Sequence, residues 1–167
     1  MLIDELKNIA RNNGIVGAGG AGFPAYAKMT EKADTVILNC VECEPLLKLH
    51  RQLLATHTEE IIQMLDEVRE SFGAKEAVIG IKSEYVTTIK AIEEVIGDFP
   101  NVRICALKAA YPMGDEVVLI YEATGRVIKP GGLPIDENVV VYNVETMYNL
   151  YSCLLYTSDA ADEEDSV

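Results

Sequence analysis

A glycine-rich segment near the N-terminus is the first part of the sequence that could bind a ligand. Residues 17–24 read Gly-Ala-Gly-Gly-Ala-Gly-Phe-Pro, and Lys28 follows four positions after the proline. Glycine lets a backbone approach a ligand closely, and consecutive backbone N–H groups can surround a phosphate. A lysine nearby can add a charge-assisted hydrogen bond. The segment therefore predicts a site for a phosphate-bearing ligand.

The same segment satisfies the dinucleotide pattern G-x-G-x-x-G through Gly17, Gly19 and Gly22, and Glu42 follows twenty positions later. That fingerprint requires a strand immediately before its first glycine. Here an amphipathic helix is expected over residues 2–13 instead, so an ordinary Rossmann dinucleotide site is disfavoured. A flexible turn is the other alternative, although four glycines within six residues exceed what a turn requires.

Cysteine spacing suggests redox or metal chemistry at one place. Cys40 and Cys43 form C-x-x-C, which is compatible with a redox pair, with half of a metal site or with ordinary reduced thiols. Zinc would need a second pair at suitable spacing, and a cubane cluster typically needs a tight C-x-x-C-x-x-C run. Cys105 and Cys153 supply neither. We therefore expect no metal site.

Hydrophobic periodicity places these segments on an alternation of strands and helices. Apolar runs predict buried strands over residues 34–39, 77–81, 102–107 and 139–142. Between and around them, helices are expected over 2–13, 24–29, from a Thr56/Glu59 capping box to Gly73, from Ser83 to Gly97, over 116–124 and from 143 to 150. Such alternation predicts an α/β fold, a Rossmann-like parallel sheet with helices on both faces.

Three polar segments follow predicted strands, at residues 39–45, 111–116 and 143–146. Ligands of such sheets bind beyond the carboxyl ends of the strands. The sequence therefore predicts that these segments and the glycine-rich loop surround one site.

Composition narrows the class of protein. The chain has 167 residues with 49% hydrophobic and 25% charged, which suits one globular domain. Its net charge of −13 disfavours nucleic-acid binding, because an acidic body repels phosphate backbones. No run approaches the ~18 apolar residues of a membrane span, and no signal peptide is visible at the start. A cytoplasmic location is expected.

The motifs together resemble one family. Gly17-Ala-Gly-Gly-Ala-Gly-Phe-Pro24 with Lys28, Asn39-Cys-Val-Glu-Cys-Glu-Pro45, Tyr111-Pro-Met-Gly-Asp-Glu116 and Asn143-Val-Glu-Thr146 are similar, in this order, to motifs of an FMN- and NADH-binding domain. That domain is shared by the flavin subunit of respiratory complex I, the corresponding subunit of the Rnf electron-transport complex and the microcompartment cobalamin reductases. The resemblance covers roughly residues 10–151 and implies an N-terminal glycine-rich FMN loop.

The resemblance also implies roles for particular residues. The glycine loop and its lysine would hold FMN, the phenylalanine would lie near the nicotinamide, and the later motifs would line the flavin, its phosphate end and NADH. Glu42 and Glu116 are the candidate catalytic residues. The implied cofactor-binding residues are Gly17, Gly19, Gly20, Phe23, Lys28, Asn39, Glu42, Cys43, Glu44, Tyr111, Gly114, Asp115, Glu116, Asn143 and Thr146.

Ordinary structural roles remain open for several of these residues. Glu42 and Glu44 could be solvated loop acids, and Tyr111 could be a half-buried packing residue. Asn143 and Thr146 could simply begin a helix.

The implied function is that of an NADH dehydrogenase-type flavin oxidoreductase, with FMN and NADH as cofactors, passing electrons to a downstream carrier. Ala18 and Val41 stand where complex I has arginine and aspartate, which favours the Rnf and cobalamin-reductase branches. The alternatives are a cobalamin reductase and a non-catalytic flavin-binding or docking module. Expected partners are other electron-transfer subunits or an iron–sulfur domain, with indirect membrane association through a complex.

The last residues no longer follow the family pattern. We expect an FMN/NADH-binding domain over residues 1–151, followed over 152–167 by an atypical acidic tail that is disordered or a truncation artefact. The tail carries five acids and no base, at Asp159, Asp162, Glu163, Glu164 and Asp165.

Overall fold

The computed structural model describes residues 1–18 and 22–164, with side chains described as far as Thr157. Its centre is a four-stranded parallel sheet in the order β3-β2-β1-β4. The strands are β1 (Thr35–Cys40), β2 (Glu76–Lys82), β3 (Val102–Leu107) and β4 (Val139–Asn143). β1 lies inside the sheet and is bonded to β2 on one side and to β4 on the other. The α/β fold and the parallel sheet that the sequence predicts are confirmed.

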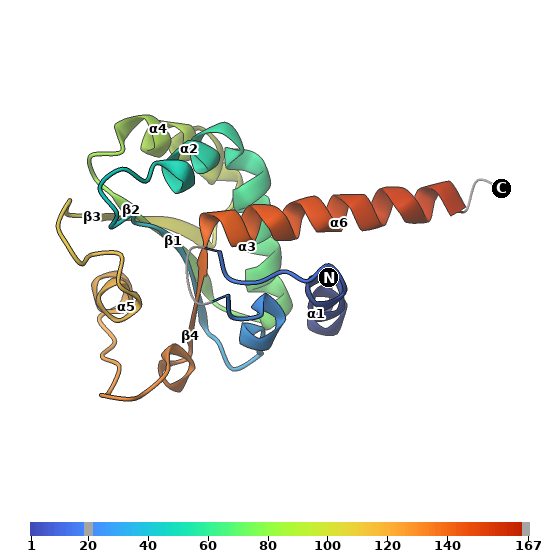
Figure 1. Ribbon diagram of the computed structural model, residues 1–167, viewed down its shortest axis with the longest axis horizontal. Helices are drawn as coiled ribbons and strands as arrows, with labels where there is room; N and C mark the ends of the chain where they lie inside the picture. Colours follow the sequence, from blue (N-terminus) through green and yellow to red (C-terminus); the bar gives the residue numbers. More distant parts are fainter. Residues whose placement is uncertain (19–21, 165–167) are drawn as a thin grey trace.

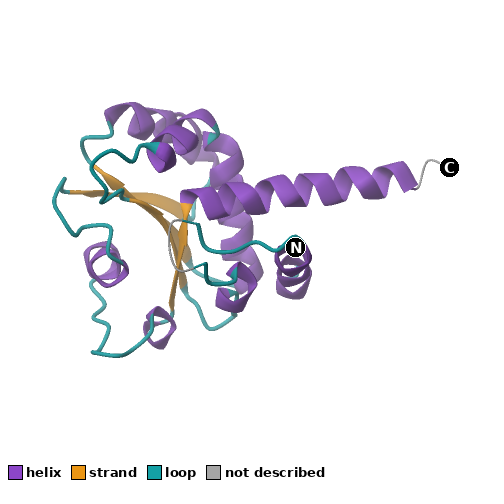
Figure 2. Cartoon of the chain, in the orientation of Figure 1, coloured by secondary structure: helices purple, strands orange, loops and turns teal. Residues whose placement is uncertain are grey.

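Helices cover both faces of the sheet unequally (Figure 1; Figure 2). The larger layer contains α1 (Ile3–Asn12), α2 (Leu49–Thr56), α3 (Thr58–Phe72), α4 (Val86–Val95) and α6 (Val144–Glu164). The other face is covered by α5 (Glu116–Thr124). Short 3₁₀ turns complete the described chain: η1 (Ala25–Lys28), η2 (Ile96–Asp98) and η3 (Pro134–Glu137).

Alternation along β1 explains how one strand supports both layers. Val36 and Leu38 belong to the core under the larger layer, whereas Ile37 between them belongs to the core under α5. All three side chains are fully buried, as the continuous apolar run predicts. On the neighbouring strand, a Cβ at Gly80 would lie 2.6 Å from a methyl group of Leu119, so this glycine lets α5 approach the sheet closely. The sheet is therefore held from both faces.

Two helix starts differ from the sequence prediction. The Thr56/Glu59 capping box is wrong, because Thr56 is the last residue of α2, a helix that the sequence pattern does not predict, and its hydroxyl donates to the Gln52 carbonyl at 3.0 Å. Ser83 does not cap α4, which begins after Tyr85. The Ser83 N–H instead donates to the Leu107 carbonyl at 2.8 Å.

The C-terminal segment is helical as far as Glu164. Residues 152–164 continue α6, where the sequence predicts an acidic tail that is disordered or a truncation artefact. The apolar face of α6 extends past residue 151, because Cys153 and Leu154 pack against the core at helical spacing from Met147 and Leu150. Residues 165–167 lie outside the described part, and the division of the chain at residue 151 stays a prediction. Among the described residues, no helix is both long enough and apolar enough to span a bilayer.

Candidate functional site

A cleft opens at the carboxyl ends of β1 and β4. From β1 the chain proceeds outward to β2 and β3 on one side, whereas β4 lies on the other, so the order of the strands reverses between β1 and β4. Asn39 and Asn143 are paired in register at this point. Parallel sheets bind ligands at such a reversal. The cleft holds about 130 Å³ and is lined by Gly17, Phe23, Ala25, Lys28, Asn39, Glu116, Val141, Tyr142, Asn143 and Thr146.

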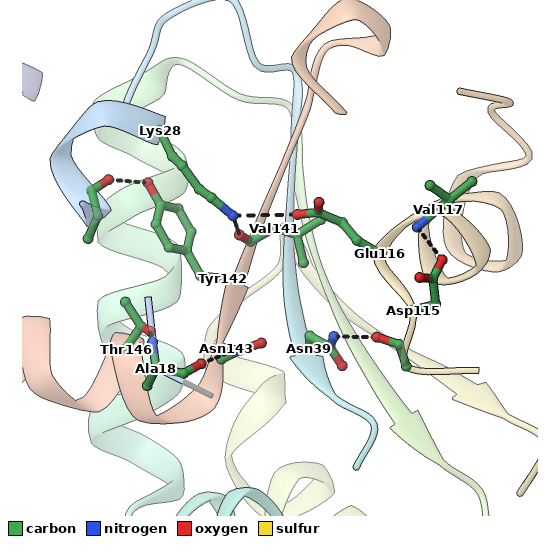
Figure 3. Close-up of polar contacts among 12 residues, drawn as sticks. Ala18, Lys28, Asn39, Asp115, Glu116, Val117, Val141, Tyr142, Asn143 and Thr146 are labelled. Atoms are coloured by element: carbon green, nitrogen blue, oxygen red, sulfur yellow. Dashed lines mark hydrogen bonds and ion pairs between the residues drawn. The ribbon is translucent and has the colours of Figure 1, made fainter. Parts of the chain in front are cut away.

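Lys28 supplies the cationic group of this cleft. It ends η1, and its Nζ lies 3.4 Å from Oε1 of Glu116 and 3.3 Å from the carbonyl oxygen of Val141 (Figure 3). Glu116 is the first residue of α5, whose N-terminus is capped by the Asp115 carboxylate. The capping bond fixes where α5 begins, and with it the place of Glu116 opposite Lys28.

The glycine-rich loop is anchored to the start of α6. The Ala18 N–H donates to Oγ1 of Thr146 at 2.9 Å, and the Asn143 side-chain amide donates to the Ala18 carbonyl (Figure 3). At the base of the loop, the Gly17 N–H donates to the Phe23 carbonyl at 2.8 Å, which joins the two ends of the loop. Gly19 and Gly20, two of the predicted ligands, lie outside the described residues. Asn143 and Thr146 thus position the loop.

A third group of contacts joins the segment after β1 to the segment before α5. The Asn39 side-chain amide donates to the Gly114 carbonyl at 3.0 Å (Figure 3). The Gly114 N–H donates to Sγ of Cys43 at 3.3 Å. Asn39 lines the cleft, whereas Cys43 and Gly114 are not among its lining residues.

Six of the described residues that the sequence predicts for the site do not line the cleft: Glu42, Cys43, Glu44, Tyr111, Gly114 and Asp115. Glu42 is 4% exposed, and its Oε1 accepts a hydrogen bond from the His50 N–H at 2.8 Å at the start of α2. Its Oε2 lies 3.6 Å from Nε of Arg51. Glu44 and Tyr111 are on the surface, with Tyr111 85% exposed. The structure gives Glu42 the position of a helix-anchoring residue, and a direct chemical role for it stays a prediction.

The C-x-x-C cysteines have different surroundings. Cys40 is fully buried, and burial together with the nearby Glu42 carboxylate raises the pKa of its thiol. A thiol with a raised pKa stays protonated, and a protonated thiol is a poor nucleophile. Both cysteines are free thiols. Over residues 1–18 and 22–157, no three His, Cys, Asp or Glu side chains gather in an arrangement that could hold a metal ion.

Sequence reasoning missed two parts of the site. Tyr142 lines the cleft, its hydroxyl donates to the Ala25 carbonyl at 3.3 Å, and burial raises its pKa. A polar-tipped aromatic at the end of an apolar strand is the signal that could have indicated it. The second part is an adjoining groove of about 390 Å³ that shares Phe23, Lys28, Glu116 and Val141 with the cleft and adds Ala27, Thr30, Lys32, Leu133, Pro134, Ile135, Val139 and Val140.

Comparisons with known proteins place this geometry among flavoproteins. The family model of the Nuo51 FMN-binding domain matches residues 10–152. The cobalamin reductase PduS of Citrobacter freundii is 39% identical over 145 residues, which are 87% of this chain and 32% of that protein. One component of the Na⁺-translocating ferredoxin:NAD⁺ oxidoreductase complex of Acetobacterium woodii is 37% identical over 147 residues, which are 86% of this chain and 33% of that component.

A solved structure agrees with the fold. The crystal structure of an NAD⁺-reducing [NiFe]-hydrogenase in the air-oxidised state superposes with a TM-score of 0.76 and 25% identity, over 90% of this chain and 30% of that one. The chain therefore spans about a third of the length of each of these three proteins.

Proposed function

The chain belongs to the Nuo51 FMN-binding domain family, and from this premise we propose that it binds FMN in the cleft between β1 and β4 and reduces it with NADH. The observation that carries the proposal is the convergence of three elements on one cleft. The anchored glycine loop, the Lys28 ammonium and the polar ends of β1 and β4 all meet at the reversal of strand order. Sequence motifs far apart in the chain thus contribute to a single site.

The residues present fit a flavin mononucleotide. The cleft alone holds about 130 Å³, less than the roughly 300–1,000 Å³ usual for ligand pockets, so it would enclose only part of a flavin. The net charge of −13 opposes a phosphate, so a local cation is required, and Lys28 provides one inside the cleft. The N–H groups of Gly17 and Ala18 are bonded to the Phe23 carbonyl and the Thr146 hydroxyl, so of these three residues it is Lys28 that can donate to the anion.

The adjoining groove fits the second substrate. It shares Phe23, Lys28 and Glu116 with the cleft, so two ligands bound in the two spaces would lie next to each other at these residues. Phe23 is 52% exposed and could cover an aromatic ring, while the aliphatic residues of β4 and η3 exclude water from it. When bound, FMN supplies the hydride acceptor and can pass electrons onward singly. The protein's part is to bind both ligands, orient them and keep water out.

The onward transfer of electrons would involve a partner. Both relatives are oxidoreductases by name, and the Acetobacterium protein is part of a complex. Other electron-transfer subunits or an iron–sulfur domain are the proposed recipients. The 39% identity to a cobalamin reductase favours a corrinoid as the second candidate acceptor.

Two measurements test the proposal. Titration of the protein with FMN should quench flavin fluorescence in a saturable manner at micromolar concentration. Anaerobic stopped-flow mixing with NADH, and separately with NADPH, should then bleach the flavin absorbance band. Bound flavin that stays oxidised with both nucleotides would contradict the oxidoreductase assignment and leave a flavin-binding docking module. Cob(III)alamin is then added to the reduced protein. Reoxidation of the flavin would favour a corrinoid acceptor, and flavin that stays reduced would favour an iron–sulfur acceptor.

A further inference from the structure

Gly114 is held at both of its backbone polar groups by two side chains, one from the end of β1 and one from the loop that follows it. Its N–H donates to Sγ of Cys43 at 3.3 Å, and its carbonyl oxygen accepts from Nδ2 of Asn39 at 3.0 Å. A loop residue that lies outside a helix or strand normally gives one or both of these groups to water. Here the side chains of Asn39 and Cys43 take the place of water.

The packing at Gly114 shows how close the two segments are. A Cβ at this position would lie 2.1 Å from the Val41 carbonyl oxygen and 2.9 Å from Sγ of Cys43. Real contacts are essentially never so short, and the Val41 carbonyl is backbone and cannot rotate away. Residue 114 must therefore be glycine for the two segments to meet in this way.

The side chains that hold Gly114 are themselves fixed. Oδ1 of Asn39 accepts from the Val41 N–H at 2.9 Å, so the Asn39 amide is engaged at both ends. The Cys43 thiol also lies 4.0 Å from the Val41 carbonyl oxygen, toward which it can donate weakly. Both side chains thus also contact the backbone of Val41. The four residues form one network, which we call the Gly114 clamp: Asn39, Val41, Cys43 and Gly114.

The clamp bears on the cleft through Glu116. Gly114 lies two residues before Glu116, and Asp115 between them caps α5. Glu116 in turn faces Lys28 at 3.4 Å. A shift of Gly114 would displace the start of α5 and the carboxylate that lines both the cleft and the groove.

We infer that Cys43 is a positioning residue of the flavin site, which acts by accepting the Gly114 N–H and so fixing the start of α5, and not by contact with the ligand. The expected loss of FMN affinity rests on the proposed function. The clamp itself can be tested without flavin. Serine can accept the same hydrogen bond through a shorter side chain, whereas alanine cannot.

The experiment compares Cys43→Ala, Cys43→Ser and the control Cys105→Ala with the wild type. Cys105 is a second half-buried thiol, located on β3 away from the cleft. The first measurement is the NMR hydrogen-exchange rate of the Gly114 amide in flavin-free protein, with the Met113 amide, bonded to the Ala110 carbonyl, as internal reference. The second is FMN affinity by fluorescence quenching, with thermal melting recorded for each variant.

Cys43→Ala should raise the Gly114 exchange rate about tenfold relative to Met113 and weaken FMN binding about five- to tenfold, at a melting temperature close to that of Cys105→Ala. Cys43→Ser should restore most of both. Unchanged Gly114 exchange in Cys43→Ala would overturn the clamp, and faster exchange with undiminished FMN affinity would overturn its positioning role. If the wild type binds no FMN but the Gly114 amide still exchanges faster in Cys43→Ala, the clamp is supported and the proposed function is overturned.

Discussion

Lys28 and Glu116 face each other across the mouth of the cleft, with Nζ and Oε1 3.4 Å apart, from elements that are 88 residues apart in the chain. Their side chains are 34% and 42% exposed, and pairs of this kind typically contribute no more than ~1 kcal/mol to stability. The ion pair of Lys28 therefore contributes little to the stability of the fold. The ammonium is available to an anionic ligand that enters the cleft.

The first prediction concerns this lysine. Lys28→Ala should weaken FMN binding about tenfold or more, because a hydrogen bond to a charged group is worth roughly 1.5–3 kcal/mol. Flavin fluorescence titration gives the affinity, and urea unfolding shows whether stability is preserved. Lys7→Ala, which removes a lysine near the exposed Asp4 on α1, should change neither. Early unfolding of the Lys28 variant with normal FMN affinity would instead make Lys28 structural.

The second prediction concerns the anchor of the glycine loop. Thr146→Val keeps the shape of the side chain but removes the acceptor of the Ala18 N–H, which is bonded at 2.9 Å. Thr146 is fully buried, so water cannot take the place of the lost hydroxyl. We expect a loss of about 1–2 kcal/mol in urea unfolding and weaker FMN binding. Thr146→Ser should preserve both, and equal behaviour of the two variants would show that the hydroxyl does not anchor the loop.

The third prediction concerns pH. Burial alone would raise the pKa of Asp34, but hydrogen bonds from Arg126 and Thr35 outweigh it and lower that pKa. A carboxyl with a lowered folded-state pKa stabilises the fold above its unfolded pKa of about 3.9, and this contribution is lost as pH falls through the folded value.

Asp34→Asn should therefore destabilise the protein at pH 7 and have a smaller effect in strong acid, below the folded-state pKa. Urea unfolding at several pH values between 7 and 2 measures this difference, with Asp4→Asn as the control for an exposed carboxylate. A destabilisation that is the same at every pH would mean that the ion pair with Arg126 contributes nothing specific.

The sheet could be predicted from the sequence because its strands are continuous apolar runs between helical patterns. β3 has the predicted bounds, and the other strands differ by one residue at one or both ends. The start of α3 could not be predicted, since Thr56 and Glu59 have capping-box spacing but Thr56 already belongs to α2. Local signals cannot show that a short helix occupies the position of a predicted cap.

The candidate site was predictable to the extent that it depends on where strands end. Gly17, Phe23, Lys28, Asn39, Glu116, Asn143 and Thr146 line one cleft, as expected of segments at the carboxyl edge of a parallel sheet. The orientation of a loop side chain depends on tertiary packing, which the sequence pattern does not specify. Glu42 illustrates this limit, because its carboxylate is buried against the start of α2.

The last prediction separates the two acidic residues that the sequence nominates for chemistry. Glu116 lines both the cleft and the groove, whereas Glu42 is buried and bonded to the His50 N–H and close to Arg51. Glutamine keeps the size of glutamate and one acceptor oxygen but has no charge. Glu116→Gln should therefore slow flavin reduction by NADH several-fold, because the groove loses a carboxylate beside the reacting ligands.

Glu42→Gln should leave that reduction rate within about threefold of the wild type, because its amide oxygen can still accept the His50 N–H. Glu42→Ala should lower the free energy of unfolding by about 1–3 kcal/mol, since the buried acceptor is lost altogether. Anaerobic stopped-flow at saturating FMN and urea unfolding give the two quantities for each variant. A large loss of reduction rate in Glu42→Gln, with stability unchanged, would mean that Glu42 turns toward the ligands when they bind, and would restore it as a catalytic residue.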